Sequence, residues 1–181
     1  MSVVSVRKDL NSLSLTLVAE FEAPIERVWQ LWADPRQLER WWGPPTYPAN
    51  VEKHDLAPGG EVSYVMTGPE GKKSRGWWRV TSVDRPMSLE FTDGFANQDG
   101  TPNTEMPTTA VQMRLSEHRG GTRMDLRFVF ESREHMEQLE RWGAFDVFLQ
   151  SVGQMDALLA APQTRRPENL AYDHETQPRR P

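Results

Sequence analysis

The sequence lacks cysteine, long apolar runs and any block of basic residues. None of its 181 residues is Cys, which excludes disulfides, iron–sulfur clusters, thiolate metal ligands and Cys nucleophiles. No stretch of about 18 apolar residues occurs, so no transmembrane helix is expected. Residues 1–9 mix acidic and basic side chains where a secretory peptide would carry its apolar segment. We therefore expect a cytoplasmic protein without membrane insertion.

Charge and residue spacing exclude further classes of function. The formal net charge is −5, so no nucleic-acid partner is expected. The four histidines, His54, His118, His135 and His174, have none of the short spacings of a metal site. The chain has neither a Gly-x-Ser-x-Gly motif nor a Gly-rich phosphate loop. We expect no metal and no cofactor, and a binding protein is favoured over an enzyme.

Bulky apolar side chains are abundant in this otherwise ordinary composition. The chain has 7 Trp, 7 Phe and 8 Met. Aromatic rings of about 150 to 250 Å² each can fill a tight interior or line a wide one. Their positions on the predicted elements decide between the two.

The hydrophobic pattern predicts an α+β fold. Alternation over 13–21 predicts a strand, and Pro24 and Pro35 each begin a short helix. Residues 47–130 then read as a run of about six antiparallel strands. Within it, the Gly-, Asn- and Asp-rich stretch 93–107 is long enough for a lid.

The C-terminal part is predicted to be helical and then irregular. Ser132 opens a long amphipathic helix that contains Gly143 and Gly153, each the site of a bend or a close approach. The Pro-rich segment 162–181 is expected to be a disordered or loosely docked tail. Residues 1–161 would form one domain, in which a curved antiparallel sheet of about six to seven strands wraps around the long helix, with two short helices after the first strand.

Several separated motifs resemble one family. Ala-Pro-Ile-Glu-Arg-Val-Trp occupies 23–29, Leu-Glu-Arg-Trp-Trp-Gly-Pro occupies 38–44, and Asp-Leu-Ala-Pro-Gly-Gly occupies 55–60. Together they resemble homologues of the activator of the 90-kDa heat-shock protein ATPase, in the START-like (SRPBCC) superfamily. The resemblance covers about residues 13–161 and implies a helix-grip fold with a deep internal cavity. Its members include hydrophobic-ligand carriers, polyketide cyclases and co-chaperone domains, so the fold alone does not choose a function.

The sequence departs from the family pattern at a few places. Ala57 stands where many relatives have Arg, and Val147 and Gly153 stand where Gly and Asp are frequent. The co-chaperones carry an additional N-terminal domain, whereas about twelve residues precede the first predicted strand here. This difference weakens the co-chaperone interpretation.

The candidate binding residues are bulky side chains on the faces expected to surround the cavity. They are Trp32, Trp42, Tyr64, Met66, Trp78, Phe91, Met113, Phe128, Phe145, Phe148, Leu149 and Val152. Trp32, Trp78 and Phe148 are expected to border the same space. No catalytic residue is assigned, although Tyr64 lies between apolar positions of its strand.

Other bulky or charged residues are expected to have structural roles. Trp29 and Trp41 should pin the short helices to the sheet, and Trp77 should point away from Trp78 on the outer surface. For Glu90, Arg114 and Asp125, a solvated outer face is favoured over the cavity.

Three functions remain open. The first is binding of a hydrophobic or aromatic small molecule between the sheet and the C-terminal helix. The second is a cyclase or dehydratase-like enzyme, which a buried acid or base facing the cavity would favour and an all-apolar lining would oppose. The third is a co-chaperone-like protein interaction, and a homodimer is compatible with all three.

Overall fold

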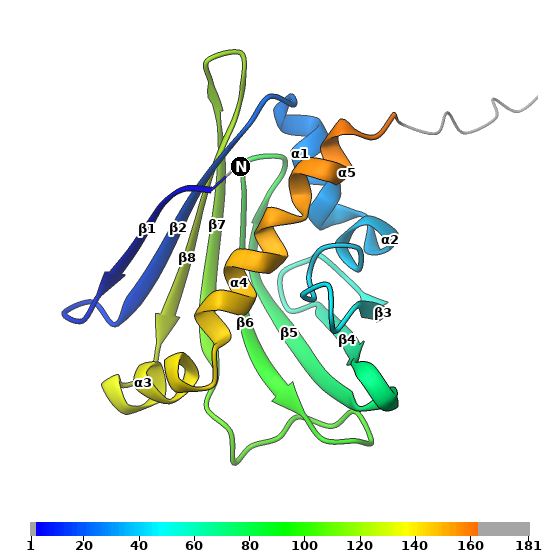
Figure 1. Cartoon of the computed structure of the whole chain (residues 1–181), viewed down its shortest axis with the longest axis vertical. Helices are drawn as coiled ribbons and strands as arrows, with labels where there is room; N and C mark the ends of the chain where they lie inside the picture. Colours follow the sequence, from blue (N-terminus) through cyan, green and yellow to red (C-terminus); the bar gives the residue numbers. More distant parts are fainter. Residues whose placement is uncertain (1–2, 163–181) are drawn as a thin grey trace, which may run out of the picture.

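A single curved antiparallel sheet forms the framework of the computed structural model, which describes residues 3–162 (Figure 1). The strand order is β1-β2-β8-β7-β6-β5-β4-β3. The strands are β1 (Val3–Asp9), β2 (Ser14–Phe21), β3 (Ala49–His54), β4 (Glu61–Thr67), β5 (Lys73–Asp84), β6 (Ser88–Ala96), β7 (Thr109–His118) and β8 (Gly121–Phe130). The expected α+β helix-grip architecture is confirmed, with eight strands rather than six to seven.

The additional strand is β1, at one edge of the sheet. It pairs with β2 alone, and five of its seven residues are exposed. Val4 and Val6 alternate with Ser5 and Arg7, but both valines are exposed, and this short pattern was not enough to predict a strand. The two short helices therefore follow β2, which is the strand predicted over 13–21.

The short helices form as the prolines predicted. Pro24 precedes α1 (Ile25–Ala33), and Pro35 begins α2 (Pro35–Leu38), where the Asp34 side chain accepts a hydrogen bond from the backbone N–H of Arg36. Pro is tolerated in the first helical turn because the N–H that it lacks would have no partner there. A short 3-10 turn, η1 (Pro69–Gly71), connects β4 to β5.

The C-terminal helix is divided into three segments rather than continuous. They are α3 (Arg133–Arg141), α4 (Ala144–Gly153) and α5 (Met155–Ala160). Gly143 separates α3 from α4 with a φ of 79°, a left-handed conformation that glycine adopts without a Cβ clash. As predicted, Ser132 begins this region, its hydroxyl accepting from the N–H of His135. The break redirects the chain so that α4 and α5 cross the concave face of the sheet (Figure 1).

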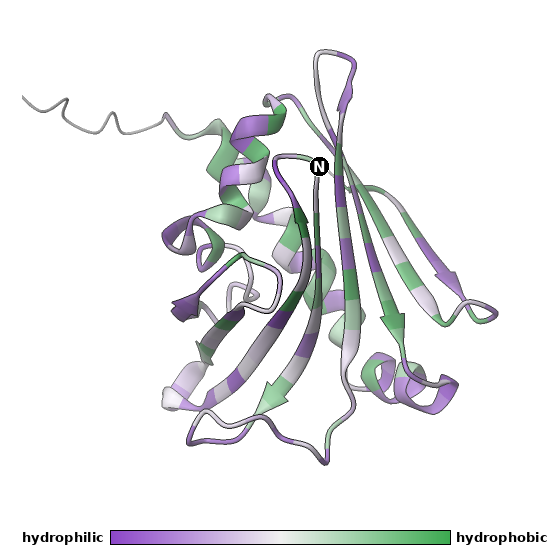
Figure 2. Cartoon of the chain, turned by 180° about the vertical axis from the view of Figure 1, so that it is seen from behind, coloured by the Kyte–Doolittle hydropathy of each residue, from purple (hydrophilic) through white to green (hydrophobic). Residues whose placement is uncertain are grey.

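The core lies between this face and the helices. Along β7 and β8 every second residue is buried, and the same alternation of polar and apolar residues is visible from the other side of the sheet (Figure 2). Trp29, Trp32, Trp41 and Trp78 are each at most 1% exposed. No helix within residues 3–162 is long and apolar enough to span a membrane. The predicted tail, 162–181, lies outside the described residues except for Pro162.

Candidate functional site

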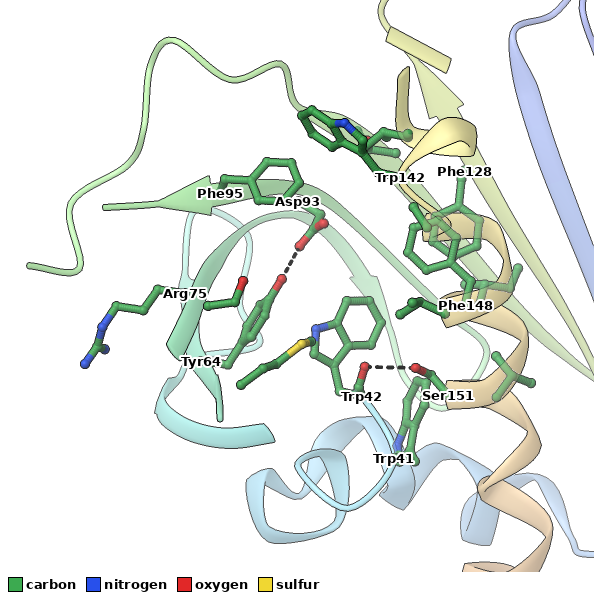
Figure 3. Close-up of a pocket in the computed structure, with 18 residues that line it drawn as sticks. Trp41, Trp42, Tyr64, Arg75, Asp93, Phe95, Phe128, Trp142, Phe148 and Ser151 are labelled. Atoms are coloured by element: carbon green, nitrogen blue, oxygen red, sulfur yellow. Dashed lines mark hydrogen bonds between the residues drawn. The ribbon is translucent and has the colours of Figure 1, made fainter. Parts of the chain in front are cut away.

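A pocket of about 320 Å³ lies between the concave face of the sheet and α4 (Figure 3). Its floor comes from β4, β5, β6, β7 and β8, and its cover from α3, α4 and the turn after α2. The lining is mostly apolar, and the volume is within the range of about 300–1,000 Å³ that is typical of small-molecule sites.

Half of the candidate residues lie on the wall of this pocket. They are Trp42, Tyr64, Met66, Phe128, Phe148 and Val152. Phe128 of β8 and Phe148 of α4 stack with ring centroids 4.1 Å apart and an interplanar angle of 8°. This stacked pair joins the helix to the floor of the pocket.

The other six candidate residues do not line the pocket. Trp32, Trp78, Phe91 and Met113 are each at most 1% exposed within the core, whereas Phe145 and Leu149 are partly buried and pack against it. The expectation that Trp32 and Trp78 share a space with Phe148 is wrong. Trp78 stacks on Phe91 at 3.9 Å, and Trp42 packs edge-on against Trp78, so rings occupy that part of the interior.

The turn that carries Trp41 and Trp42 is attached directly to α4. Ser151 Oγ donates a hydrogen bond to the carbonyl oxygen of Trp42 (3.2 Å), and Gln154 Nε2 donates to that of Gly43 (2.7 Å). The indole of Trp41 donates to the carbonyl of Leu31. Trp41 is buried as predicted for a packing residue, but it also lies on the pocket wall.

A hydrogen-bonded pair, Tyr64 and Asp93, stands at the polar end of the pocket (Figure 3). Tyr64 Oη donates to Asp93 Oδ1 at 2.8 Å. Tyr64 belongs to β4 and Asp93 to β6, so the ring must reach across β5. It does so at Gly76, the cross-strand partner of Tyr64, where a Cβ would collide with the tyrosine ring. Gly76 therefore makes this pairing across the middle strand possible.

The electrostatics of this pair keep a proton in the pocket. Burial raises the pKa of Asp93 to about 7, although the hydrogen bond from Tyr64 lowers it in part. Burial and the neighbouring Asp93 carboxyl raise the pKa of Tyr64 well above its usual value. Near neutral pH, Tyr64 is thus a neutral donor and Asp93 is easily protonated.

Sequence reasoning missed Asp93 and Trp142. The predicted loop 93–107 begins at Asp93, but β6 continues to Ala96. The strand keeps the alternation of Leu89 and Phe91, which turns Asp93 to the concave face. Trp142 lies at the junction of α3 and α4, 55% exposed and on the pocket wall. The alternation was a usable signal for Asp93, whereas the position of Trp142 depends on the helix break at Gly143.

The charged residues considered for the cavity lie outside it. Arg114 is 4.0 Å from Glu90, and Asp125 pairs with Arg123 at 3.0 Å, all with exposed or partly exposed side chains. Trp77 points away from Trp78, as expected, but it is partly buried, and its indole donates to the carbonyl of Phe95. Its ring covers Gly94.

Metal ligands are not grouped in the described part of the chain. Residues 3–162 contain no cluster of three or more His, Asp or Glu side chains that could hold an ion. His174 lies outside these residues.

Comparison with known proteins identifies the family. Residues 22–160 match the model of the activator of Hsp90 ATPase homolog 1-like proteins. A crystal structure of a Mycobacterium smegmatis protein is 47% identical, with a TM-score of 0.81, and the match covers 90% of this chain and 99% of that one. A solution structure of a protein from Arthrobacter aurescens is 44% identical, with a TM-score of 0.85 and coverage of 97% and 100%.

A more distant relative has the same fold. The AHSA1 protein of Silicibacter pomeroyi is 26% identical, with a TM-score of 0.65 and coverage of 81% of this chain and 97% of that one. No curated protein matches the chain. Because the family model matches well over half of the sequence, the chain belongs to the family of activator of Hsp90 ATPase homolog 1-like proteins.

Proposed function

We propose that the protein binds an apolar, aromatic small molecule in the pocket beneath α4. The observation that carries the proposal is the open space lined by Trp42, Phe128, Phe148 and Trp142, in an interior that is otherwise closely packed. A cavity of about 150 Å³ holds one benzene ring, so a pocket of about 320 Å³ suits about two fused rings. Burial of the ligand would contribute about 25 cal/mol per Å² of apolar surface.

The test is a binding titration with a variant that fills the pocket. Ala144 lies on the pocket wall, and Ala157, on α5, is exposed. Tryptophan fluorescence and thermal shift should respond to bicyclic aromatics, fatty acids or flavonoids in the native protein. Ala144→Phe should abolish this response, whereas Ala157→Phe should retain it. The proposal fails if no compound changes either signal, or if both variants bind equally well.

One observation favours a second candidate, an enzyme that moves a proton. Asp93 faces an apolar pocket with a pKa of about 7, which suits a general acid or base near neutral pH. The native protein would then catalyse exchange of the α-protons of 2-tetralone in D₂O, followed by proton NMR, and Asp93→Asn would not. Exchange at the same rate with both proteins would leave Asp93 without a catalytic role.

The cytoplasmic location, the homodimer and the co-chaperone role remain predictions. Light scattering tests whether the protein is a dimer. Co-purification with the 90-kDa heat-shock protein, together with stimulation of the ATPase of that chaperone, tests the co-chaperone role.

A further inference from the structure

The polar end of the pocket contains an unused hydrogen-bond donor. Trp42 is 7% exposed and lies on the pocket wall, and its indole Nε1 is buried without a hydrogen-bond partner. A buried donor without an acceptor is destabilising, because it loses its hydrogen bond to water and gains none in the protein. The indoles of Trp29, Trp32 and Trp78 also have no partner, but Trp42 is the one of these four that lines the pocket, where a ligand acceptor can reach it.

This donor and the Asp93 carboxyl meet at the same place. Asp93 Oδ1 is 2.8 Å from the Tyr64 hydroxyl. The indole of Trp42 lies near enough to that hydroxyl to lower the pKa of Tyr64, against the larger effects of burial and Asp93, without bonding to it. The rings of Trp42 and Tyr64 are edge to face, with centroids 6.0 Å apart. One donor and one acceptor therefore border the same end of the pocket (Figure 3).

The donor and the acceptor together restrict the chemistry of a ligand group. A hydrocarbon would satisfy neither, and an ammonium group has donors but no acceptor for the Trp42 N–H. Above the Asp93 pKa of about 7, a carboxylate would accept from Trp42 but place a second negative charge beside Asp93. A hydroxyl is the smallest neutral group that accepts one hydrogen bond and donates another.

We propose that Trp42 and Asp93 recognise the hydroxyl group of an otherwise apolar, aromatic ligand. The indole N–H of Trp42 donates to the ligand oxygen, and the ligand O–H donates to the Asp93 carboxyl. Tyr64 is a positioning residue, which holds Asp93 toward the pocket. This inference rests on the proposed binding function and adds the polar group of the ligand.

The experiment compares 2-naphthol, naphthalene and 2-naphthoate by isothermal titration calorimetry at about pH 8, above the Asp93 pKa of about 7. Since a net hydrogen bond contributes about 0.5–1.5 kcal/mol, 2-naphthol should bind about tenfold more tightly than naphthalene, and 2-naphthoate should bind more weakly than 2-naphthol. Trp42→Phe removes one of the two hydrogen bonds and should reduce this preference to about threefold. Trp142→Phe is the matched control: it removes an indole from the mouth of the pocket, so it should weaken both neutral ligands by the same factor.

A second measurement is made on the native protein, so no variant has to bind a ligand. The indole N–H signal of Trp42, assigned by its loss in Trp42→Phe, should move in a nitrogen–proton correlation spectrum on addition of 2-naphthol and less on addition of naphthalene. Equal affinity for 2-naphthol and naphthalene, or equal shifts, would overturn hydroxyl recognition and leave the binding function intact. If neither ligand binds, the proposed function and this inference both fail.

Discussion

The concave face of the sheet is covered in two different ways. Beneath α1, α2 and the turn after them, the rings of Trp32, Trp41, Trp78 and Phe91 fill the space. Beneath α4, rings of the same kind border an open pocket. Residue type therefore does not decide whether an aromatic side chain fills or lines.

The attachment of the covering element explains the difference. The Trp41–Trp42 turn sits directly over its part of the sheet, and Trp32 lies 4.6 Å from Trp41 and 6.2 Å from Trp78, centroid to centroid. In contrast, α4 is attached at its C-terminal end by Ser151 and Gln154, and its N-terminal end follows the break at Gly143. The pocket opens where the helix is held by fewer contacts to the sheet.

The largest expected difference between the two regions is in stability. Trp78→Ala should lower the free energy of unfolding by about 3–5 kcal/mol, because it leaves a void among fixed rings. Phe148→Ala should cost about 1–2 kcal/mol, because Phe148 is only partly buried and already borders open space. Urea unfolding of both variants measures the two losses. Equal losses would mean that the pocket collapses in solution and that the two regions are packed alike.

Next in size is the effect of the helix break. Gly143→Ala should destabilise the protein by about 1–2 kcal/mol, since its φ of 79° is unfavourable for a residue with a Cβ. Gly153→Ala is the control: a Cβ there has open space around it, and alanine favours the helix, so stability should be unchanged or rise by up to about 1 kcal/mol. Thermal unfolding compares the two. A harmless Gly143→Ala would show that the break is not needed for the position of α4.

Alternation and turn chemistry predicted most of the fold. The inward faces of β2, β7 and β8 and the two proline-started helices follow from local patterns. The edge strand β1 was not predicted, because its alternation is limited to the exposed Val4 and Val6. Gly143 was expected to bend the helix or to mark a close approach. Whether a glycine breaks a helix depends on how the segments on either side of it pack against the rest of the protein.

The site was predictable only in part. Trp42, Tyr64 and Phe148 lie on the pocket wall. For Tyr64 and Phe148 this agrees with the faces predicted for their strand and helix, and for Trp42 with its expected place near the two short helices. Trp32 and Trp78 also have inward faces, but they pack against each other and against neighbouring rings, and periodicity does not contain such tertiary contacts. Asp93 required the true end of β6, and strand ends are the least certain part of a pattern.

The pocket carboxyl should give the protein an unusual pH dependence. The folded-state pKa of Asp93 is about 7, above its ordinary value of 3.8. The folded state therefore binds the extra proton between about pH 4 and 7, and the Asp93 contribution to stability is lost as pH rises through that window, at no more than about 1.4 kcal/mol per pH unit. Asp93→Asn should remove this decline, as measured by urea unfolding across the range.

An exposed carboxyl outside the pocket, that of Glu131, provides the opposite control. Glu131 accepts hydrogen bonds from Thr108, chiefly from its hydroxyl, and these lower the pKa of Glu131 below its usual 4.5. The stabilising contribution of Glu131 is present above that value and is lost as pH falls. Glu131→Gln should therefore change the free energy of unfolding only at acidic pH. If Asp93→Asn and Glu131→Gln change the free energy of unfolding over the same pH range, the Asp93 carboxyl is not held in an apolar setting.

The smallest expected effect on stability is that of Trp142. It is the one pocket-wall tryptophan that is largely exposed, because Gly143 directly after it turns the chain into α4. Replacing an exposed side chain usually changes stability by about 0.5 kcal/mol or less, so Trp142→Ala should leave urea unfolding nearly unchanged. Stopped-flow displacement of a bound bicyclic aromatic should nevertheless become several-fold faster, because the indole covers the mouth. A large loss of stability with an unchanged dissociation rate would assign Trp142 to the packed core, like Trp32 and Trp78, and would reduce the open region to the floor around Phe128.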